Sequence, residues 1–446
     1  MTGLETDTFT QAPVPTKLEV TSIDSSGNQT ELATAPLPAS TMDLGSLDPN
    51  SAGIIQVTGF DDAGTRILAG QSLPVLFGWI DGVTLPVFIQ RTGEFARLPD
   101  PPSDSRPSPV AGVLNGRYIV VTGGADPALA STTMIYDLME LEPVSPAVTL
   151  PLTPTSMAFV APVADDSDGG STDSIGWLIN AAGVYQYDFS TGTPTSVILP
   201  TGYLPADIAG GATVSAPDGS QYIVGATRTT GAPTAAVLAI DSRGNPSWLT
   251  LAQTRLGAAA TWVASVGLVV TGGNQTGDPT AHGAEVITVA SASTGAPYPY
   301  PPDPSVGSGA VALDGSHVLI AGGVLPDGSS AGVRKIDLSC MTQCAPVAWQ
   351  PLGASITGAQ AFAGGVGSAS DAGSAGSATS AVVVGSEPPT STTPGLTHVY
   401  QVTSSATTEI PTKVAHTNAG ALSSPIGVVG SVLLVGGAPA IESLGL

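Results

Sequence analysis

The sequence is poor in positively charged residues, and this scarcity excludes whole classes of function. Its 446 residues contain three lysines and nine arginines against 35 acidic residues, which gives a net charge of −23 with the histidines neutral. A surface of this sign repels nucleic-acid phosphates and anionic lipid headgroups. We therefore expect no nucleic-acid partner. Cations, basic proteins and neutral glycans remain compatible with the charge, which can also act simply to keep the protein soluble.

Long hydrophobic runs and a targeting signal are missing as well. No segment reaches about 18 charge-free residues dense in Leu, Ile and Phe, so we predict no transmembrane segment. The opening stretch MTGLETDTFTQAP lacks the basic and apolar regions of a secretory signal. The chain is then either cytosolic or an exported protein whose signal is absent from this sequence. Its low lysine content and its Ser, Thr and Gly richness are typical of exported bacterial proteins, so we expect a periplasmic, outer-surface or extracellular location.

Cysteine is almost absent, with two residues, Cys340 and Cys344, in DLSCMTQCAPVAW. They could form a local disulfide, half of a metal site, or two free thiols. A metal site would need two further ligands, and the four histidines are scattered along the chain at positions 282, 317, 398 and 416. We expect a disulfide and hence an oxidising compartment, with a modest effect on stability because the closed loop is so short.

The residues that are abundant favour short strands separated by turns. The chain has 55 Gly and 39 Pro, many Val, Thr, Ser and Ala, and 42% hydrophobic residues. Val and Thr alternating with Gly and Pro indicate strands and turns, whereas long helices need Ala, Leu, Glu, Lys and Arg. The hydrophobic content is enough to build a core and excludes wholesale disorder. We therefore predict an all-β fold.

A repeated unit organises most of the chain. The segment RLGAAATWVASVGLVVTGG (255–273) predicts two buried strands with a turn near 265–267 and a stop at Gly272-Gly273. Strands that are buried on both faces read as continuous small-apolar runs of this kind. The same pattern recurs seven times, ending at positions 124, 183, 226, 273, 323, 386 and 437. The spacing of roughly fifty residues is the period of kelch-type propeller blades.

The rest of each unit strengthens this interpretation. An alternating strand follows, then a fourth short strand that in two units carries Trp248 or Trp349. The chain resembles the kelch repeat family, in which Gly-Gly follows the second strand, an aromatic residue lies in the fourth, and an Arg can precede the next blade. The resemblance covers about residues 85–446, and four of the seven units have a true Gly-Gly. It implies a seven-bladed kelch-type β-propeller over 85–446.

Closure of the ring requires strands from elsewhere in the chain. Few residues follow Gly437, whereas LPVFIQRTGEFARLP (85–99) reads as two outer strands with a hairpin at Thr92-Gly93. We predict that 85–99 completes the last blade and so removes an exposed sheet edge. Residues 1–84, after a flexible start, read as short strands between Ser, Gly, Asp and Asn turns, and we predict a small β-sandwich of immunoglobulin-like type.

Candidate binding residues lie on the loops. In a blade the loops after strands 2 and 4 share one rim, where kelch-family ligands are commonly met. On that rim the sequence offers six candidate ligand-binding residues, Tyr203, Arg228, Arg255, Asn274, Asp278 and His282. For Arg255 we favour a structural role at the junction between blades.

Two units are longer than the rest because residues 164–174 and 366–380 are inserted between their first and second strands. Both insertions would lie on the opposite rim, with the cysteine pair. Asp165, Asp166, Asp168 and Asp173 in the first insertion offer the oxygen ligands that Ca²⁺ prefers. No Glu closes an EF-hand loop there, and a solvated acidic loop is the alternative. We expect no other cofactor.

Enzymatic motifs are scarce. Copper radical enzymes of the galactose-oxidase type combine a β-domain with a kelch propeller, but they need a Tyr cross-linked to a Cys and a Tyr beside a His, and no Tyr-His dipeptide occurs here. Signatures such as G-x-S-x-G, H-E-x-x-H and the P-loop are absent from the sequence. We expect an exported or cell-surface, non-catalytic binding or structural module that recognises a protein or glycan through its rim loops. A secreted kelch-type oxidoreductase is the alternative.

Overall fold

The computed structural model describes residues 1–39, 41–45, 47–79, 84–145, 148–160, 175–225, 232–275, 278–288, 294–364, 378–390, 395–427 and 430–445. These residues form 34 strands and two single-turn 3₁₀ helices, η1 (Phe77–Trp79) and η2 (Pro205–Asp207). The fold is all-β, as predicted. None of the helices in the described part of the chain has the length and apolar character needed to span a membrane.

The N-terminal strands form one six-stranded sheet in the order β2-β1-β3-β4-β6, with β5 paired to β3. The strands are β1 (Lys17–Asp24), β2 (Gln29–Pro36), β3 (Ala52–Phe60), β4 (Arg66–Gln71), β5 (Val75–Leu76) and β6 (Gln90–Arg91). Strand β3 alternates buried and partly exposed residues, and its buried face packs with Val20 and Phe77 in a hydrophobic cluster. This sheet therefore has a small core of its own.

The other described strands form seven four-stranded sheets with antiparallel pairing throughout. The first three are β8 (Pro109–Leu114), β9 (Tyr118–Gly123), β10 (Met134–Asp137) and β11 (Glu142–Val144); β12 (Ser156–Phe159), β13 (Ile175–Asn180), β14 (Gly183–Asp188) and β15 (Thr193–Ser196); and β16 (Ala212–Ser215), β17 (Gln221–Val224), β18 (Thr234–Ile240) and β19 (Pro246–Arg255).

The next three sheets follow in chain order. They are β20 (Ala259–Val263), β21 (Gly267–Thr271), β22 (Ala284–Ile287) and β23 (Ala296–Tyr298); β24 (Gly309–Ala312), β25 (His317–Ala321), β26 (Val333–Asp337) and β27 (Val347–Ala348); and β28 (Thr357–Gly364), β29 (Ser380–Ser386), β30 (Thr397–Thr403) and β31 (Thr407–Glu409). The segment 255–273 is thus two strands, β20 and β21, joined by the turn at 264–266, as the sequence predicted.

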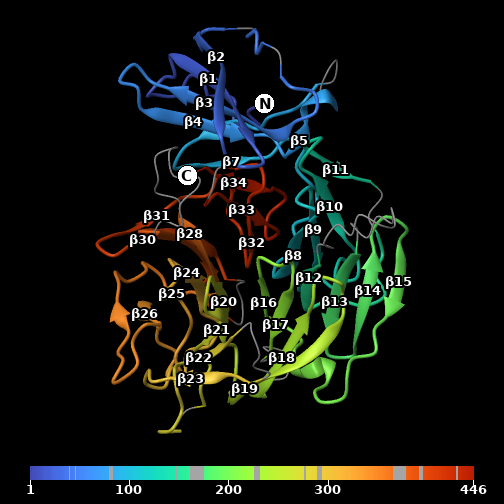
Figure 1. Cartoon of the computed structure of the whole chain (residues 1–446), viewed down its shortest axis with the longest axis vertical. Coiled ribbons are helices and arrows are strands. Elements are labelled where there is room, and N and C mark those ends of the chain that lie inside the picture. Colours follow the sequence, from blue (N-terminus) through green and yellow to red (C-terminus); the bar gives the residue numbers. More distant parts are fainter. Residues whose placement is uncertain are drawn as a thin grey trace.

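The sheets follow one another around a common centre (Figure 1). The first strand of each sheet lies innermost, and β32, β8, β12, β16, β20, β24 and β28 contact one another in that order. The Ala421 backbone amide of β32 donates to the Gln360 side-chain oxygen of β28 at 2.7 Å and so joins the two ends of the series. The second strands lie behind these and are buried along their whole length in β21, β29 and β33. This propeller-like arrangement leaves a central cavity between the first strands.

The last sheet joins the two ends of the chain. It contains β32 (Gly420–Ser423), β33 (Val432–Val435), β34 (Glu442–Leu444) and β7 (Phe95–Arg97). The expectation that 85–99 supplies both outer strands is wrong in one respect, because Gln90–Arg91 pairs with β4 of the N-terminal sheet. The chain beyond Gly437 turns back and forms the third strand of this sheet, β34. The fourth position is therefore left for β7, which pairs with β34.

Four Gly-Gly pairs hold adjacent sheets together. Both glycines of each pair have left-handed φ angles, between 64° and 92° in Gly123-Gly124, Gly272-Gly273, Gly322-Gly323 and Gly436-Gly437. In three of the pairs the amide of the second glycine donates to the chain entering the next sheet. Gly273 donates to the Ser305 carbonyl, Gly323 to the Ile356 carbonyl and Gly437 to the Arg106 carbonyl, each at 2.8 Å. A Cβ on Gly437 would lie 2.3 Å from the Thr417 carbonyl oxygen. Glycine is therefore required where the sheets meet.

Candidate functional site

A central cavity of about 1210 Å³ runs along the first strands of all seven sheets. Each sheet contributes at least one lining residue from that strand, namely Ala111, Ala158, Thr213, Ala259, Ala310, Gln360 and Ala421. Small side chains at these inner positions keep the cavity open, because larger ones would meet at the narrow centre. The cavity is therefore a direct product of the small-apolar runs in the repeat.

The described residues that line the central cavity have neutral side chains. Apart from glycine, alanine, valine and proline, they offer the hydroxyls of Ser108, Thr155, Ser308 and Thr357 at the end where the first strands begin. Larger apolar groups, Met157 and Phe159 among them, lie further along. Such a lining recognises a ligand by shape and by hydrogen bonds to hydroxyl, amide and backbone groups.

Arg255 is fully buried at the end of β19. Its Nε donates to the Glu285 Oε1 atom at 2.6 Å, and its two terminal nitrogens donate to the Gly272 and His282 carbonyls, each at 2.7 Å. Glu285 also accepts a hydrogen bond from the Ala252 amide. Because three guanidinium nitrogens bind internal acceptors, this geometry favours the structural role over contact with a ligand.

Asn274 and His282 belong to the same network. The Gln253 side-chain oxygen accepts from the His282 amide at 2.8 Å and from the Asn274 side-chain nitrogen at 3.5 Å. The Asn274 side-chain oxygen accepts from the Asp303 amide at 2.8 Å. The structure thus brings Arg255, Asn274 and His282 together around the loop that joins β21 to β22.

Asp278 and Tyr203 are placed differently. Asp278 is exposed on the β21–β22 loop, and hydrogen bonds from the Thr280 side chain and backbone lower the pKa of its carboxyl, so it is ionised. The Tyr203 ring packs edge-on against Trp248 with 5.5 Å between centroids, and its hydroxyl lies 3.2 Å from the Thr250 hydroxyl. Tyr203 therefore contacts the middle of β19, whereas the Arg255 network lies at the end of that strand.

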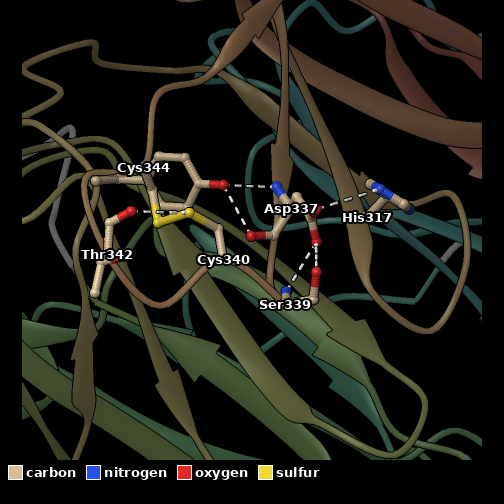
Figure 2. Close-up of a disulfide and its surroundings, with 7 residues drawn as sticks. His317, Asp337, Ser339, Cys340, Thr342 and Cys344 are labelled. Atoms are coloured by element: carbon tan, nitrogen blue, oxygen red, sulfur yellow. Dashed lines mark hydrogen bonds and ion pairs between the residues drawn. A yellow bond between two sulfur atoms is a disulfide. The ribbon is translucent and has the colours of Figure 1, made fainter.

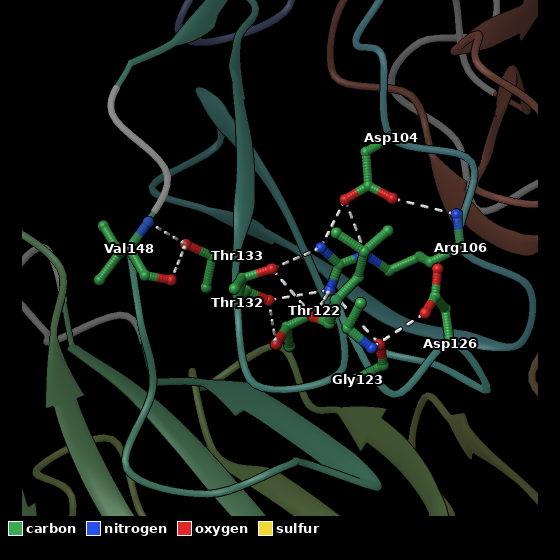
Figure 3. Close-up of polar contacts among 10 residues, drawn as sticks. Asp104, Arg106, Thr122, Gly123, Asp126, Thr132, Thr133 and Val148 are labelled. Carbon is green, nitrogen blue, oxygen red and sulfur yellow. Dashed lines mark hydrogen bonds and ion pairs between the residues drawn. The ribbon is translucent and has the colours of Figure 1, made fainter.

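Two other sheets contain a basic side chain in the place of Arg255. Arg106, 1% exposed, pairs with Asp104 and donates to the Gly123, Leu129 and Thr132 carbonyls, as Figure 3 shows in part. In the last sheet, the Nδ1 atom of the buried His416 lies 2.7 Å from the Gly436 carbonyl oxygen. Sequence reasoning missed both, although Arg106 and Arg255 each stand 17 residues before the first glycine that they bind.

The predicted disulfide is confirmed. Cys340 and Cys344 are bonded to each other in the loop between β26 and β27 (Figure 2). The adjacent Asp337 carboxylate accepts from the Ser339 amide and hydroxyl and lies 3.9 Å from the Nε2 atom of His317. Because both cysteines are used in this bond, neither is free to form the tyrosine cross-link of the copper radical oxidases.

Several predicted site residues lie outside the described residues. They are Arg228 and the aspartates of the first insertion, Asp165, Asp166, Asp168 and Asp173, together with most of the second insertion. The Ca²⁺ site therefore stays a prediction. Within the described ranges, no group of three or more His, Cys, Asp or Glu side chains is arranged to hold a metal ion.

A second cavity, which we call the junction pocket, has a volume of about 200 Å³ and lies between the β16–β19 and β20–β23 sheets. Its polar and aromatic lining consists of Ser220, Tyr222, Asp241, Ser247, Trp262 and Thr288. It opens beside the β16–β17 and β18–β19 turns, on the rim opposite the predicted ligand loops. Sequence reasoning missed it because its two aromatic residues come from different repeat units.

No protein-family model matches the chain, and a search of curated proteins returns no significant match. The kelch resemblance of residues 85–446 therefore stays a prediction.

Proposed function

We propose that this chain is an exported or cell-surface, non-catalytic module that binds a protein or glycan through a kelch-type propeller. In this proposal the seven four-stranded sheets are the kelch blades within residues 85–446, and β6 belongs with residues 1–84 in a small immunoglobulin-like β-sandwich. Seven four-stranded sheets around one cavity, within the described residues, support the first part. The separate core cluster around Val20 and Phe77 supports the second.

The observation that carries the binding function is the chemistry of the central cavity. Its described lining provides hydroxyls, amides and methyl groups from seven strands that are fixed by hydrogen-bonded sheets. Groups of this kind hold a ligand by fit and hydrogen bonding, whereas acid–base catalysis uses titratable side chains close to the reacting atoms.

The rim beside this cavity would add ionic and polar contacts. Asp278 is exposed there, and His282 is partly exposed on the same loop. The buried Arg255 fixes that loop through the His282 carbonyl, and the buried Asn274 fixes it through the Asp303 amide. A preorganised loop binds at lower entropic cost than a mobile one. The disulfide between Cys340 and Cys344 supports export, because such bonds persist in oxidising compartments.

Binding of the purified full-length chain to a glycan array and to an array of bacterial surface proteins tests this function. We expect saturable binding to at least one ligand, weakened at least fivefold by Asp278→Ala and unchanged by Asp327→Ala, which removes an exposed carboxylate from the corresponding β25–β26 loop. Absence of binding on both arrays would overturn the proposal. A radical signal after copper loading, with oxidation of primary alcohols, would favour the oxidoreductase instead.

A further inference from the structure

The junction pocket combines aromatic rings with polar groups in one small hollow. Tyr222 of β17 and Trp262 of β20 are stacked across the two sheets, with 5.5 Å between ring centroids and 22° between ring planes. Both side chains are partly exposed and both line the pocket. Below them the two sheets pack tightly through Val224, Leu251 and Leu268. The pocket is therefore open to solvent on one side and closed on the other by the hydrophobic cluster between the two sheets.

A small residue, Ala239, keeps the junction pocket open. In the β16–β19 sheet, Tyr222 stands opposite Ala239, and Ala239 stands opposite Ser247, so the three side chains form one row on the face toward the next sheet. Ala239 at the centre of the row leaves the space between the Tyr222 ring and the Ser247 hydroxyl unfilled. A larger residue at this position would fill the pocket from its floor.

Hydrogen-bonding groups surround the opening. Ser247 and Thr288 are exposed hydroxyl residues on opposite sheets, and Asp241 lies in the β18–β19 turn. Burial acts to raise the pKa of Asp241, but hydrogen bonds from Asn245 and the Arg243 amide lower it overall, so the carboxylate is ionised and accepts hydrogen bonds. Burial raises the pKa of the Tyr222 phenol, which stays neutral and can donate.

We propose that the junction pocket binds a single sugar ring of a neutral glycan. A pyranose ring carries C–H groups on its faces, which pack on aromatic rings, and hydroxyls around its edge, which match the carboxylate and hydroxyls at this opening. The volume of about 200 Å³ admits one ring and leaves the rest of a glycan chain in solvent. The inference rests on the proposed binding function and assigns one ligand class and one position to it.

The charge of the protein restricts which sugars fit. Asp241 at the opening and the net charge of −23 disfavour uronic acids, sialic acids and sulfated sugars. The stacked arrangement also disfavours a quaternary ammonium ligand, because each ring uses one face against the other and the two cannot enclose a cation. Neutral hexoses and N-acetylhexosamines therefore fit this pocket best.

Titration of the full chain with the methyl glycosides of glucose, galactose, mannose and N-acetylglucosamine tests the inference, with tryptophan fluorescence and saturation-transfer NMR as readouts. We expect at least one sugar to bind. Ala239→Leu should abolish binding by filling the hollow. The double variant Ser247→Ala, Thr288→Ala, at two exposed positions, should weaken binding by about tenfold through loss of two hydrogen bonds. Ser404→Ala with Ser405→Ala, in the exposed β30–β31 loop on the same rim, is the matched control and should bind as wild type.

The outcomes separate this inference from the proposed function. Wild-type affinity in folded Ala239→Leu and in the double variant would overturn the junction pocket and leave a glycan-binding function standing elsewhere. If none of the four glycosides binds, the pocket assignment is wrong, and the array experiment decides the proposed function independently. Tighter binding of glucuronic acid than of glucose would also overturn the assignment of a neutral sugar to the junction pocket.

Discussion

Arg255 and Glu285 form an ion pair enclosed within the fold, with 0% and 1% of their side chains exposed and 2.6 Å between Nε and Oε1. The pair links the end of β19 to β22 in the following sheet, and it supports the loop that carries Asp278 and His282. Its importance follows from desolvation, because removal of one partner leaves the other charge buried without compensation.

Replacement of Arg255 by Met should therefore destabilise the protein strongly. We expect the free energy of unfolding to fall by about 3–5 kcal/mol, measured by urea denaturation, since Glu285 keeps its Ala252 hydrogen bond but loses its counter-charge. The double variant Arg255→Met, Glu285→Met removes both charges and should be more stable than the single one. A single variant within 1 kcal/mol of wild type, on the order of the error in such extrapolations, would contradict this structural role.

The Gly-Gly junctions should tolerate no side chain. Gly437→Ala combines a left-handed φ of 70° with a Cβ placed 2.3 Å from the Thr417 carbonyl oxygen. The control is Gly328→Ala, because Gly328 has a φ of 84° with no atom within 4 Å of the added Cβ. The free energy of unfolding of the control variant should fall by about 1–2 kcal/mol, from backbone strain alone. Thermal unfolding should show a clearly larger loss for Gly437→Ala, and equal losses would count against the junction.

These junctions also show what the sequence could predict. In a segment such as 255–273, the small-apolar run predicts a buried strand and the Gly-Gly predicts its end, because both signals lie in the local sequence. The structure places β20 and β21 there. The composition of the third strand of the last sheet, Glu442–Leu444, is not typical of a strand. It becomes a strand because β33 and β7 lie on either side of it, which a local pattern does not encode.

The sequence could likewise predict some of the candidate site residues and not others. Arg255 was recognisable from its position before a Gly-Gly, and its partner Glu285 was not, since their pairing depends on the fold. Tyr222 and Trp262 meet through the packing of two sheets. Their contact therefore needed the three-dimensional arrangement, although each residue lies in a segment whose strand character the sequence predicts.

The disulfide should contribute little to global stability. The bond between Cys340 and Cys344 closes a loop with a sequence separation of 4, and the chain-entropy relation gives roughly 2 kcal/mol at most for so short a loop. The Cys340→Ser, Cys344→Ser variant should lower the melting temperature slightly. Addition of a reductant should leave the melting temperature of this variant unchanged while lowering that of wild type to match it.

Asp188 should make stability depend on acid pH. Hydrogen bonds from the Ser190 hydroxyl, with support from Thr191, lower the pKa of Asp188 to about 2 from its ordinary 3.8. Because the folded-state pKa is depressed, this stabilisation is complete above about pH 4 and is lost as the pH falls toward 2. Asp188→Asn should therefore differ most from wild type at neutral pH and least at pH 2, as measured by urea denaturation. A constant difference across this window would contradict the assignment.

The pairing of β7 with β34 sets the order in which the chain can complete its fold. Phe95 leaves the ribosome long before its partner Leu444 is synthesised. Until then the nearly fully buried side chain of Phe95 and the open edge of β33 lack their native neighbours. Nascent and truncated chains therefore present an unpaired strand edge that can capture another polypeptide. The ring becomes resistant to such misassembly only after Leu444 has been made and has paired with Phe95.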